Sequence, residues 1–344
     1  MNWIFQKTGI INHYDKNIHS GTQPVRVIHY MLIHMFQNTN PEFFKDLLKQ
    51  IEEGKLNKQL NLIFGEEAIR IGNGKLRTPR VNHESKQIEL HESFLSYLWC
   101  CTYSVFVTYI ETIDHPKLNK ECGMEKYPIS ADNIDKAKEL FDYARYLIVD
   151  FKAWDKDNLP NPEIYKAEHR DYIEQTNCYY TEAVKFILCH EFTHLKQHIE
   201  LINDDTSDSN YLEFEVEADN NAIDMMMQGI SYLNDSLSVA HRLAVETGVV
   251  FGLLSMFFFR ATTDGIKHPN AEDRLSNALE KLGLADNPYA WGIACVGLQM
   301  WDEQFGHNFN WSEDPVSYKA QYYDIVNQIK DRQNNESKQD LGVN

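Results

Sequence analysis

The chain has 344 residues, of which 43% are hydrophobic, and its 33 basic and 51 acidic side chains give a net charge of −18. This length allows one large domain or two modest ones, and the apolar content excludes a mainly disordered chain. A surface this negative repels phosphate backbones and anionic lipid headgroups, which argues against nucleic-acid binding and polybasic membrane attachment.

The cysteines and the N-terminus indicate the compartment. The six cysteines contain no Cys-x-x-Cys pair and are too sparse for a secreted disulfide scaffold. The first residues, Met1 to Lys7, lack the basic start and long apolar run of a signal peptide. We therefore expect a cytoplasmic protein.

The N-terminal third combines helical and strand-like patterns. Helices are expected over residues 24–37 and 41–53, the second opening on a proline, which is tolerated in a first turn. Residues 68–81 predict a small hairpin with its turn at Asn73-Gly74, and residues 87–90 predict a further strand.

The rest of the chain is predicted to be helical. Residues 91–111 form a very apolar helical pattern, and a loop marked by proline and glycine is expected over 115–130. The apolar stretch 243–259 has 17 residues, short of the roughly 20 that span a bilayer, so we expect a buried core helix and no membrane span. Further helices are expected over 131–152, 163–202, 210–228, 237–261, 269–282, 288–303 and 315–333.

The distribution of these patterns predicts the fold class. Strand patterns are confined to the N-terminal third, so we expect a mainly helical α+β fold with a small N-terminal sheet. A boundary near residue 125 would separate an N-terminal segment, 1–125, from a helical body, 126–344, unless the chain forms one domain.

The motif that indicates chemistry is His190-Glu191-Phe192-Thr193-His194. Histidines four residues apart lie on one helix face and can bind one zinc ion together, and Glu191 lies close enough to act as a general base on water. Chance gives such a motif in about one chain in twenty of this length, so a second ligand block is needed. The required helix is predicted by an apolar stripe: Val184, Leu188, Phe192, Leu195, Ile199 and Ile202.

An acidic block, Glu213 to Asp219, follows one short connection later. Catalytic zinc takes three protein ligands and leaves a position for water, and a carboxylate on a second helix suits the third place. We favour Glu215, because Asp219 lies four residues further on the same face and can orient a ligand histidine. Glu217 is the alternative ligand, and a merely solvated acidic face is the alternative interpretation of the block.

His198 extends the histidine face by one more turn. Three ligands along two turns of one straight helix cannot converge on one ion, so we expect His198 at the surface or beside a ligand. The metzincin pattern is absent, because Glu200 stands where that class has its third histidine.

A third block runs from His268-Pro269 to Arg274. As site residues, His268 and Arg274 would stabilise the oxyanion of a tetrahedral intermediate or the metal-binding carboxylate. Alternatively, His268 only marks a helix start, and Arg274 pairs with an acid that fastens the helix.

The three blocks in this order resemble the gluzincin metallopeptidases. Because the chain lacks the several hydrophobic spans of the membrane members, it resembles more closely the soluble phage-exclusion peptidase Lit family, whose N-terminal signature is similar to residues 88–111. The resemblance covers about residues 88–275 and leaves the first 87 residues unmatched. It implies a gluzincin-type fold with Zn²⁺ held by His190, His194 and Glu215, Glu191 as base, Asp219 as partner of a ligand histidine, and His268 and Arg274 as further site residues.

The resemblance also implies a biological role. Lit-like proteins are cytoplasmic proteases of abortive infection, which cleave elongation factor Tu when a phage product is bound to it. Two alternatives remain: a regulatory metalloprotease that cleaves a repressor or another single partner, and a non-catalytic protein that zinc merely stabilises. Glu191 argues against the last, because a structural zinc site has no use for a base.

Overall fold

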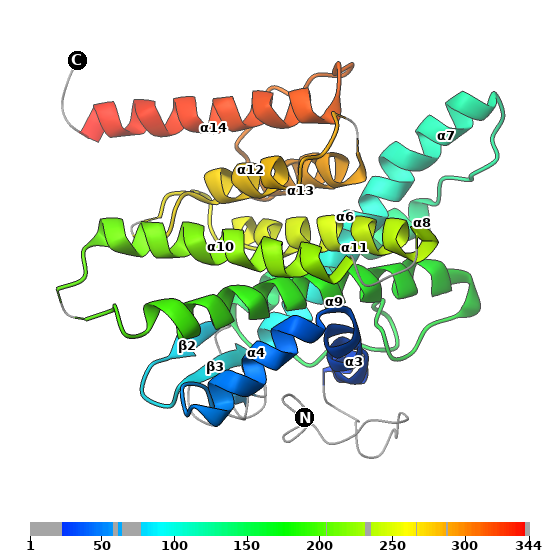
Figure 1. Cartoon of the computed structure of the whole chain (residues 1–344). Helices are drawn as coiled ribbons and strands as arrows, with labels where there is room; N and C mark the ends of the chain where they lie inside the picture. Colours follow the sequence, from blue (N-terminus) through cyan, green and yellow to red (C-terminus); the bar gives the residue numbers. More distant parts are fainter. Residues whose placement is uncertain are drawn as a thin grey trace.

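The computed structural model describes residues 23–57, 61–63, 77–203, 205–230, 235–265, 267–286 and 288–340. Helices make up most of it, with one three-stranded sheet near the N-terminal end (Figure 1). The expected mainly helical α+β fold with a small N-terminal sheet is therefore confirmed.

Three short helices begin the described chain. The 3₁₀ helix η1 (Pro24–Ile28) leads into α3 (His29–Thr39), and α4 (Pro41–Glu52) opens on its proline, as expected for a residue without an amide hydrogen. Helices α3 and α4 pack through stacked and edge-on phenylalanine rings, and the ring centroids of Phe36 and Phe43 lie 4.5 Å apart. Phe43 also contacts Phe192, so α4 is anchored directly beside the His-Glu motif.

The sheet has the order β1-β3-β2. β1 (Asn61–Ile63) runs parallel to β3 (Gln87–His91), and β2 (Arg80–Asn82) runs antiparallel to β3 and forms one edge. The strand expected at 87–90 is thus present. The first strand of the expected hairpin and its Asn73-Gly74 turn lie outside the described residues.

Helix α6 (Glu92–Tyr109) follows β3 directly and is buried along almost its whole length. It continues through a π-helical turn, Ile110–Asp114, into α7 (His115–Cys122). The loop expected at 115–130 is therefore wrong in its first half. Pro116 stands in the first turn of α7, where proline is tolerated, and Gly123 ends that helix in the left-handed conformation, φ 65°.

The other helices occur close to the expected positions. The helix expected from residue 163 starts only at Arg170, because the Asn161 side chain accepts hydrogen bonds from the amides of Glu163 and Ile164 and holds a turn there. The remaining helices are α8 (Ala131–Val149), α9 (Arg170–Thr193) with a π-helical end (His194–His198), α10 (Asp208–Ile230), α11 (Asp235–Leu254), α12 (Ala271–Lys281), α13 (Tyr289–Phe305) and α14 (Tyr318–Asp340).

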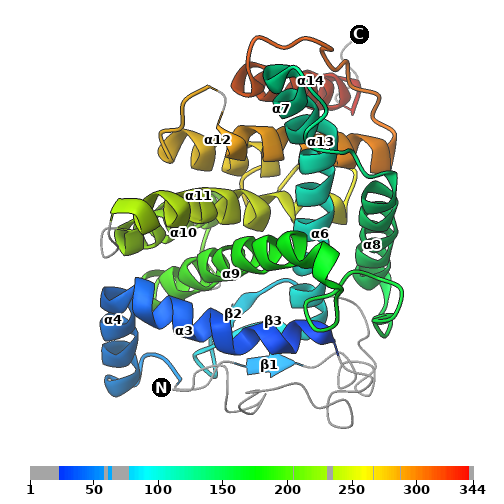
Figure 2. The same ribbon diagram turned by 90° about the vertical axis from the view of Figure 1, so that its right-hand side faces the viewer.

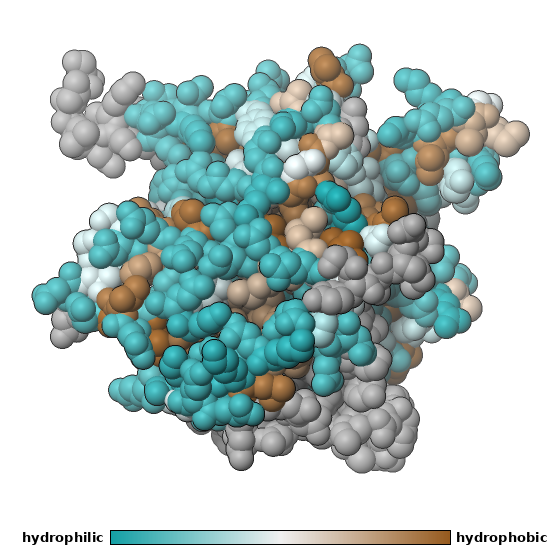
Figure 3. Space-filling view, viewed as in Figure 1, coloured by the Kyte–Doolittle hydropathy of each residue, from teal (hydrophilic) through white to brown (hydrophobic). Residues whose placement is uncertain are grey.

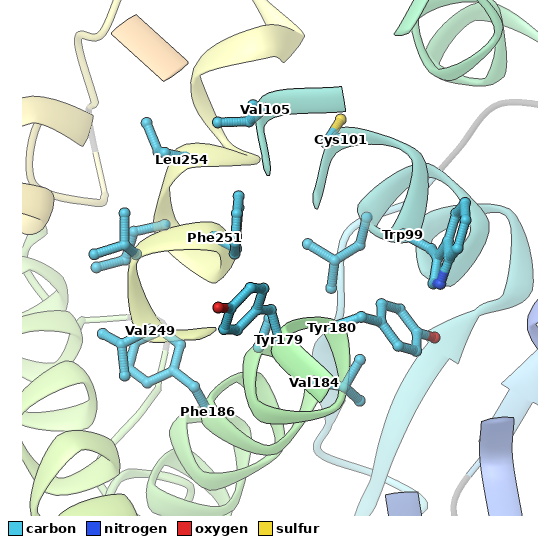
Figure 4. Close-up of a cluster of buried hydrophobic side chains, with 14 of the residues drawn as sticks. Trp99, Cys101, Val105, Tyr179, Tyr180, Val184, Phe186, Val249, Phe251 and Leu254 are labelled. Atoms are coloured by element: carbon cyan, nitrogen blue, oxygen red, sulfur yellow. The ribbon is translucent and has the colours of Figure 1, made fainter. Parts of the chain in front are cut away.

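The core lies where α6, α9 and α11 meet. Figure 2 shows α6 upright, with α8 beside it and α9 crossing it. One cluster of buried apolar side chains runs from Val25 to Ile329, so the expected segments 1–125 and 126–344 share this core. Its centre, shown in Figure 4, includes Trp99, Cys101 and Val105 of α6, Tyr179, Tyr180 and Val184 of α9, and Val249, Phe251 and Leu254 of α11.

Gly248 lets α11 approach α9 closely. A Cβ at this position would lie 2.4 Å from Cβ of Glu182 and 2.9 Å from the backbone nitrogen of Ala183. No side chain fits at that distance, so the glycine sets the spacing between the two helices.

Two helical segments, Glu92–Cys122 and Ser238–Phe259, are long and apolar enough to cross a membrane by length and composition. Their most apolar windows are 89% and 78% buried inside the protein, which is the packing expected of core helices. The face of the molecule in Figure 3 is mostly hydrophilic, with hydrophobic residues in small patches.

Candidate active site

Three segments meet at one cleft of about 550 Å³: the end of α9, the first half of α10, and the start of α12 with the loop before it. In Figure 1, α10 runs alongside α9. The predicted residues that line the cleft are His190, Glu191, His194, Glu215, His268 and Arg274. The seventh, Asp219, contacts two of these and is buried.

Three side chains at the cleft can hold a metal ion. The Nε2 atoms of His190 and His194 lie 3.0 Å apart, and the carboxylate of Glu215 lies 3.5 Å from the first and 3.3 Å from the second. Their ligand atoms all lie within 4.8 Å of one another. Two imidazole nitrogens and one carboxylate match the donor set of a catalytic divalent metal, so the residues fit such an ion.

The structure separates the two carboxylates considered as the third ligand. Glu215 is buried and faces both histidines. The Glu217 side chain is 52% exposed, and its Oε2 lies 3.3 Å from Nε2 of His198. Glu217 is therefore not part of the three-residue group.

Asp219 fixes the orientation of His190. Its Oδ1 lies 2.8 Å from Nδ1 of His190, so the ring presents Nε2 to the cleft. Arg274 donates to both oxygens of the same carboxylate. Burial alone would raise the pKa of Asp219, but the Arg274 guanidinium outweighs it and holds the pKa at about 2. The carboxylate is thus ionised and can accept a hydrogen bond from Nδ1 of His190.

Glu191 is buried in the cleft wall, with 8% of its surface exposed. Burial raises the pKa of its carboxyl group to about 7, although the neighbouring positive charge of His190 opposes this shift. A carboxylate with a pKa near the working pH can both accept and return a proton. These are the requirements for a general base in peptide hydrolysis.

His268 and Arg274 both contact Glu215 of this three-residue group. Nδ1 of His268 lies 3.0 Å from Oε2 of Glu215, and Arg274 comes within 3.6 Å of the same oxygen. The backbone approaches itself closely in this loop, and only glycine fits at residue 265, because a Cβ there would lie 1.9 Å from the carbonyl oxygen of His268. Arg274 thus fastens α12 to Asp219 and also approaches the Glu215 carboxylate.

The sequence alone did not reveal the burial of His198 or many of the residues that line the cleft. His198, left open between surface and site, is 1% exposed and hydrogen-bonded to His194. Spacing alone placed it on the right face but gave no information on its burial. The cleft is also lined by apolar side chains whose sequence pattern is that of ordinary core, and by residues 78–81 and His83. The apolar residues are Phe94, Phe186, Ile187, Leu253, Met256 and Phe259.

Comparison with known proteins assigns the family. Residues 88–294 match the Peptidase U49 family, which is more than half of the chain, so the chain belongs to this family of peptidases. All seven predicted site residues lie inside the matched range, which begins at the same residue as the resemblance drawn from the motifs. The match supports a Lit-type peptidase. No curated protein and no solved structure matches the chain significantly.

Proposed function

We propose that the protein is a zinc-dependent endopeptidase. The observation that carries the proposal is the convergence of His190, His194 and Glu215 beside the buried Glu191. Nitrogen and carboxylate donors with a general base at hand are typical of metal-assisted hydrolysis. Membership of a peptidase family supports the peptide bond as the target.

The roles of the residues follow from their positions. His190 and His194, through Nε2, and the Glu215 carboxylate would hold the ion. When bound, zinc acts as a Lewis acid and lowers the pKa of water to about 7. Glu191 would take the proton of the attacking water and return it to the leaving amine. His268, whose side chain is 60% exposed at the cleft, would donate a hydrogen bond to the carbonyl oxygen under attack.

The shape of the cleft suits an extended polypeptide. β2 pairs with β3 on one side and forms an edge of the described sheet, and residues on and before it line the cleft. An edge strand offers backbone donors and acceptors to a segment that aligns beside it. The apolar side chains that line the cleft would receive a large hydrophobic side chain of the substrate.

A narrower proposal concerns the biological role. A Lit-type peptidase would act in the cytoplasm against phage, cleaving elongation factor Tu when a phage-derived activator is bound to it. The support is the family match together with the three motifs. The test is incubation of the protein with purified elongation factor Tu, with and without a bound phage peptide, followed by mass spectrometry of the fragments.

The general proposal is tested by comparing wild type with Glu191→Gln. Both should contain one zinc ion per chain by elemental analysis, but only the wild type should cleave proteins in a bacterial lysate, and a chelator should abolish this cleavage. Glu213→Gln, an exposed change on α10, is the control and should behave as wild type. Equal cleavage by Glu191→Gln would refute the mechanism. Zinc without any cleavage, both with and without the phage peptide added to the lysate, would favour the non-catalytic alternative.

A further inference from the structure

His198 lies behind His194, on the side away from the metal group. The two Nδ1 atoms are 2.9 Å apart, whereas Nε2 of His194 faces His190 and Glu215. His198 is 1% exposed, and its ring stacks on Phe214 of α10 with centroids 4.5 Å apart and an interplanar angle of 18°. Its own Nε2 lies 3.3 Å from Glu217. The ring is thus fixed on every polar side.

The π-helical end of α9 brings these residues together. The amide of Ile199 donates to the carbonyl of His194, five residues back, at 3.0 Å. This wider turn changes the angle between His194 and His198 from that of a straight α-helix, so their rings meet edge to face with centroids 5.0 Å apart. We expected that three histidines on one straight helix could not share an ion. In the structure the third, His198, contacts His194 and is not part of the group that could hold a metal.

We propose that His198 and Glu217 form a hydrogen-bonded support that positions His194 for the metal. This inference rests on the proposed metal site. An imidazole that gives its Nε2 lone pair to a metal keeps its proton on Nδ1. His194 must then donate to Nδ1 of His198, so His198 carries its proton on Nε2 and donates to the Glu217 carboxylate. One set of tautomers satisfies every hydrogen bond from His194 through His198 to Glu217.

The support of His194 parallels that of His190. Asp219 accepts the Nδ1 proton of His190 directly, whereas Glu217 acts on His194 through the intervening ring of His198. Both carboxylates belong to α10, which also supplies Glu215. One helix therefore provides a ligand and orients the other two, and the glutamate that is not a ligand acquires a role.

The test measures zinc affinity by chelator competition, and Co²⁺ absorption spectra report the ligand geometry. His198→Phe keeps the stacking on Phe214 but removes the acceptor, and should weaken zinc binding about 10- to 100-fold. His198→Asn places an amide oxygen near the lost Nδ1 and should restore most of the affinity and the wild-type Co²⁺ spectrum. If His198 had a purely structural role, the loss of zinc affinity in each variant would follow the fall in the melting temperature of the metal-free protein.

If His198→Phe does not fold, Glu217→Ala tests the support instead, because the Glu217 side chain is half exposed and its removal should not disturb the fold. It should weaken zinc binding several-fold, and Glu213→Ala on the same helix should not. Wild-type affinity in both His198→Phe and Glu217→Ala would overturn the support. Failure of the wild-type chain to bind zinc would overturn the proposed function as well, so the two failures are distinguishable.

Discussion

Arg274 donates two hydrogen bonds of 2.7 Å to Asp219, from Nε to Oδ2 and from Nη2 to Oδ1. The same carboxylate also holds the ring of His190. The orientation of a proposed metal ligand on α9 therefore depends on an arginine of α12, through an acid of α10. A guanidinium suits this task because its planar fork matches both carboxylate oxygens at once.

Arg274→Met should lower the free energy of unfolding by about 3–5 kcal/mol, because it leaves a buried carboxylate without its partner. The control is Lys281→Met, since Lys281 joins α12 to Asp224 of α10 at 2.8 Å but is solvent-accessible. That surface pair should contribute about 0–1 kcal/mol. Chemical denaturation measures both losses of unfolding free energy. Equal losses would show that the buried pair stabilises the fold no more than the surface pair does.

Metal binding should release a proton from His190. Burial alone would lower the pKa of this histidine, but its hydrogen bonds to Asp219 and Glu215, with their negative charges, raise it to about 10. The protonated ring stabilises the metal-free fold below its ordinary pKa of 6.5, and this contribution is lost as the pH rises through about 10.

Zinc must displace that proton, so the observed affinity should rise about tenfold per pH unit between roughly pH 7 and 9. Calorimetry at pH 8 in buffers of different ionisation enthalpy should find about one proton released per zinc. Asp219→Asn removes one source of the raised pKa and should release less. A pH-independent zinc affinity would contradict the protonated state of His190.

Sequence reasoning succeeded where chemistry repeats at helical spacing. His190 and His194, four residues apart, and Glu215 and Asp219, also four apart, occupy the positions that a helix gives them. No local pattern shows which helices are neighbours. The expectation that the two pairs lie close together came instead from the three protein ligands that catalytic zinc needs and from the family resemblance.

The rest depended on information that no local pattern carries. Pro116 reads as a loop signal yet begins α7, because proline is equally suited to a first helical turn. β1 has three residues, too few for a period of two to be recognised. The burial of His198 depends on Phe214 of another helix, and the apolar cleft wall has the same residue types as the core.

A buried charge pair joins the N-terminal helices to the core. Nζ of Lys185 on α9 lies 2.8 Å from Oε2 of Glu182 and donates to Oγ1 of Thr39 at 3.0 Å, and both charged side chains are fully buried. His241 of α11 contacts the other oxygen of Glu182 at 3.3 Å. The pair therefore sits where three parts of the chain meet.

Lys185→Met should lower the free energy of unfolding by about 3–5 kcal/mol, because it leaves Glu182 charged and uncompensated in the core. The double variant Lys185→Met/Glu182→Gln removes both charges with little change of volume and should recover part of that loss. Denaturant unfolding of the wild type, of Lys185→Met and Glu182→Gln alone, and of the double variant gives the coupling energy. If the double variant were less stable by the sum of the single losses, the charges would not be coupled.

The cleft rim differs in charge from the rest of this acidic chain. Apart from the predicted site residues, the basic or imidazole side chains that line it among the described residues are Arg80, His83, Arg260 and Lys267, and no further acidic side chain of the described residues lines it. Arg260 and Lys267 are exposed, and Lys267 lies 4.4 Å from the centroid of the Tyr211 ring. Such a rim attracts acidic segments that the overall charge would repel.

Peptides with glutamate flanking the cleaved bond should therefore be better substrates than matched peptides with lysine, by several-fold in kcat/KM, because each exposed ion pair contributes about 0.2–1 kcal/mol. Arg260→Glu/Lys267→Glu should reverse the preference. Lys117→Glu/Lys120→Glu on α7 makes the same change in net charge away from the cleft and should leave the preference intact. The difference should fade above roughly 0.5 M salt, where the Debye length falls below about 5 Å. An unchanged preference in the rim variant would mean that apolar contacts alone select the substrate.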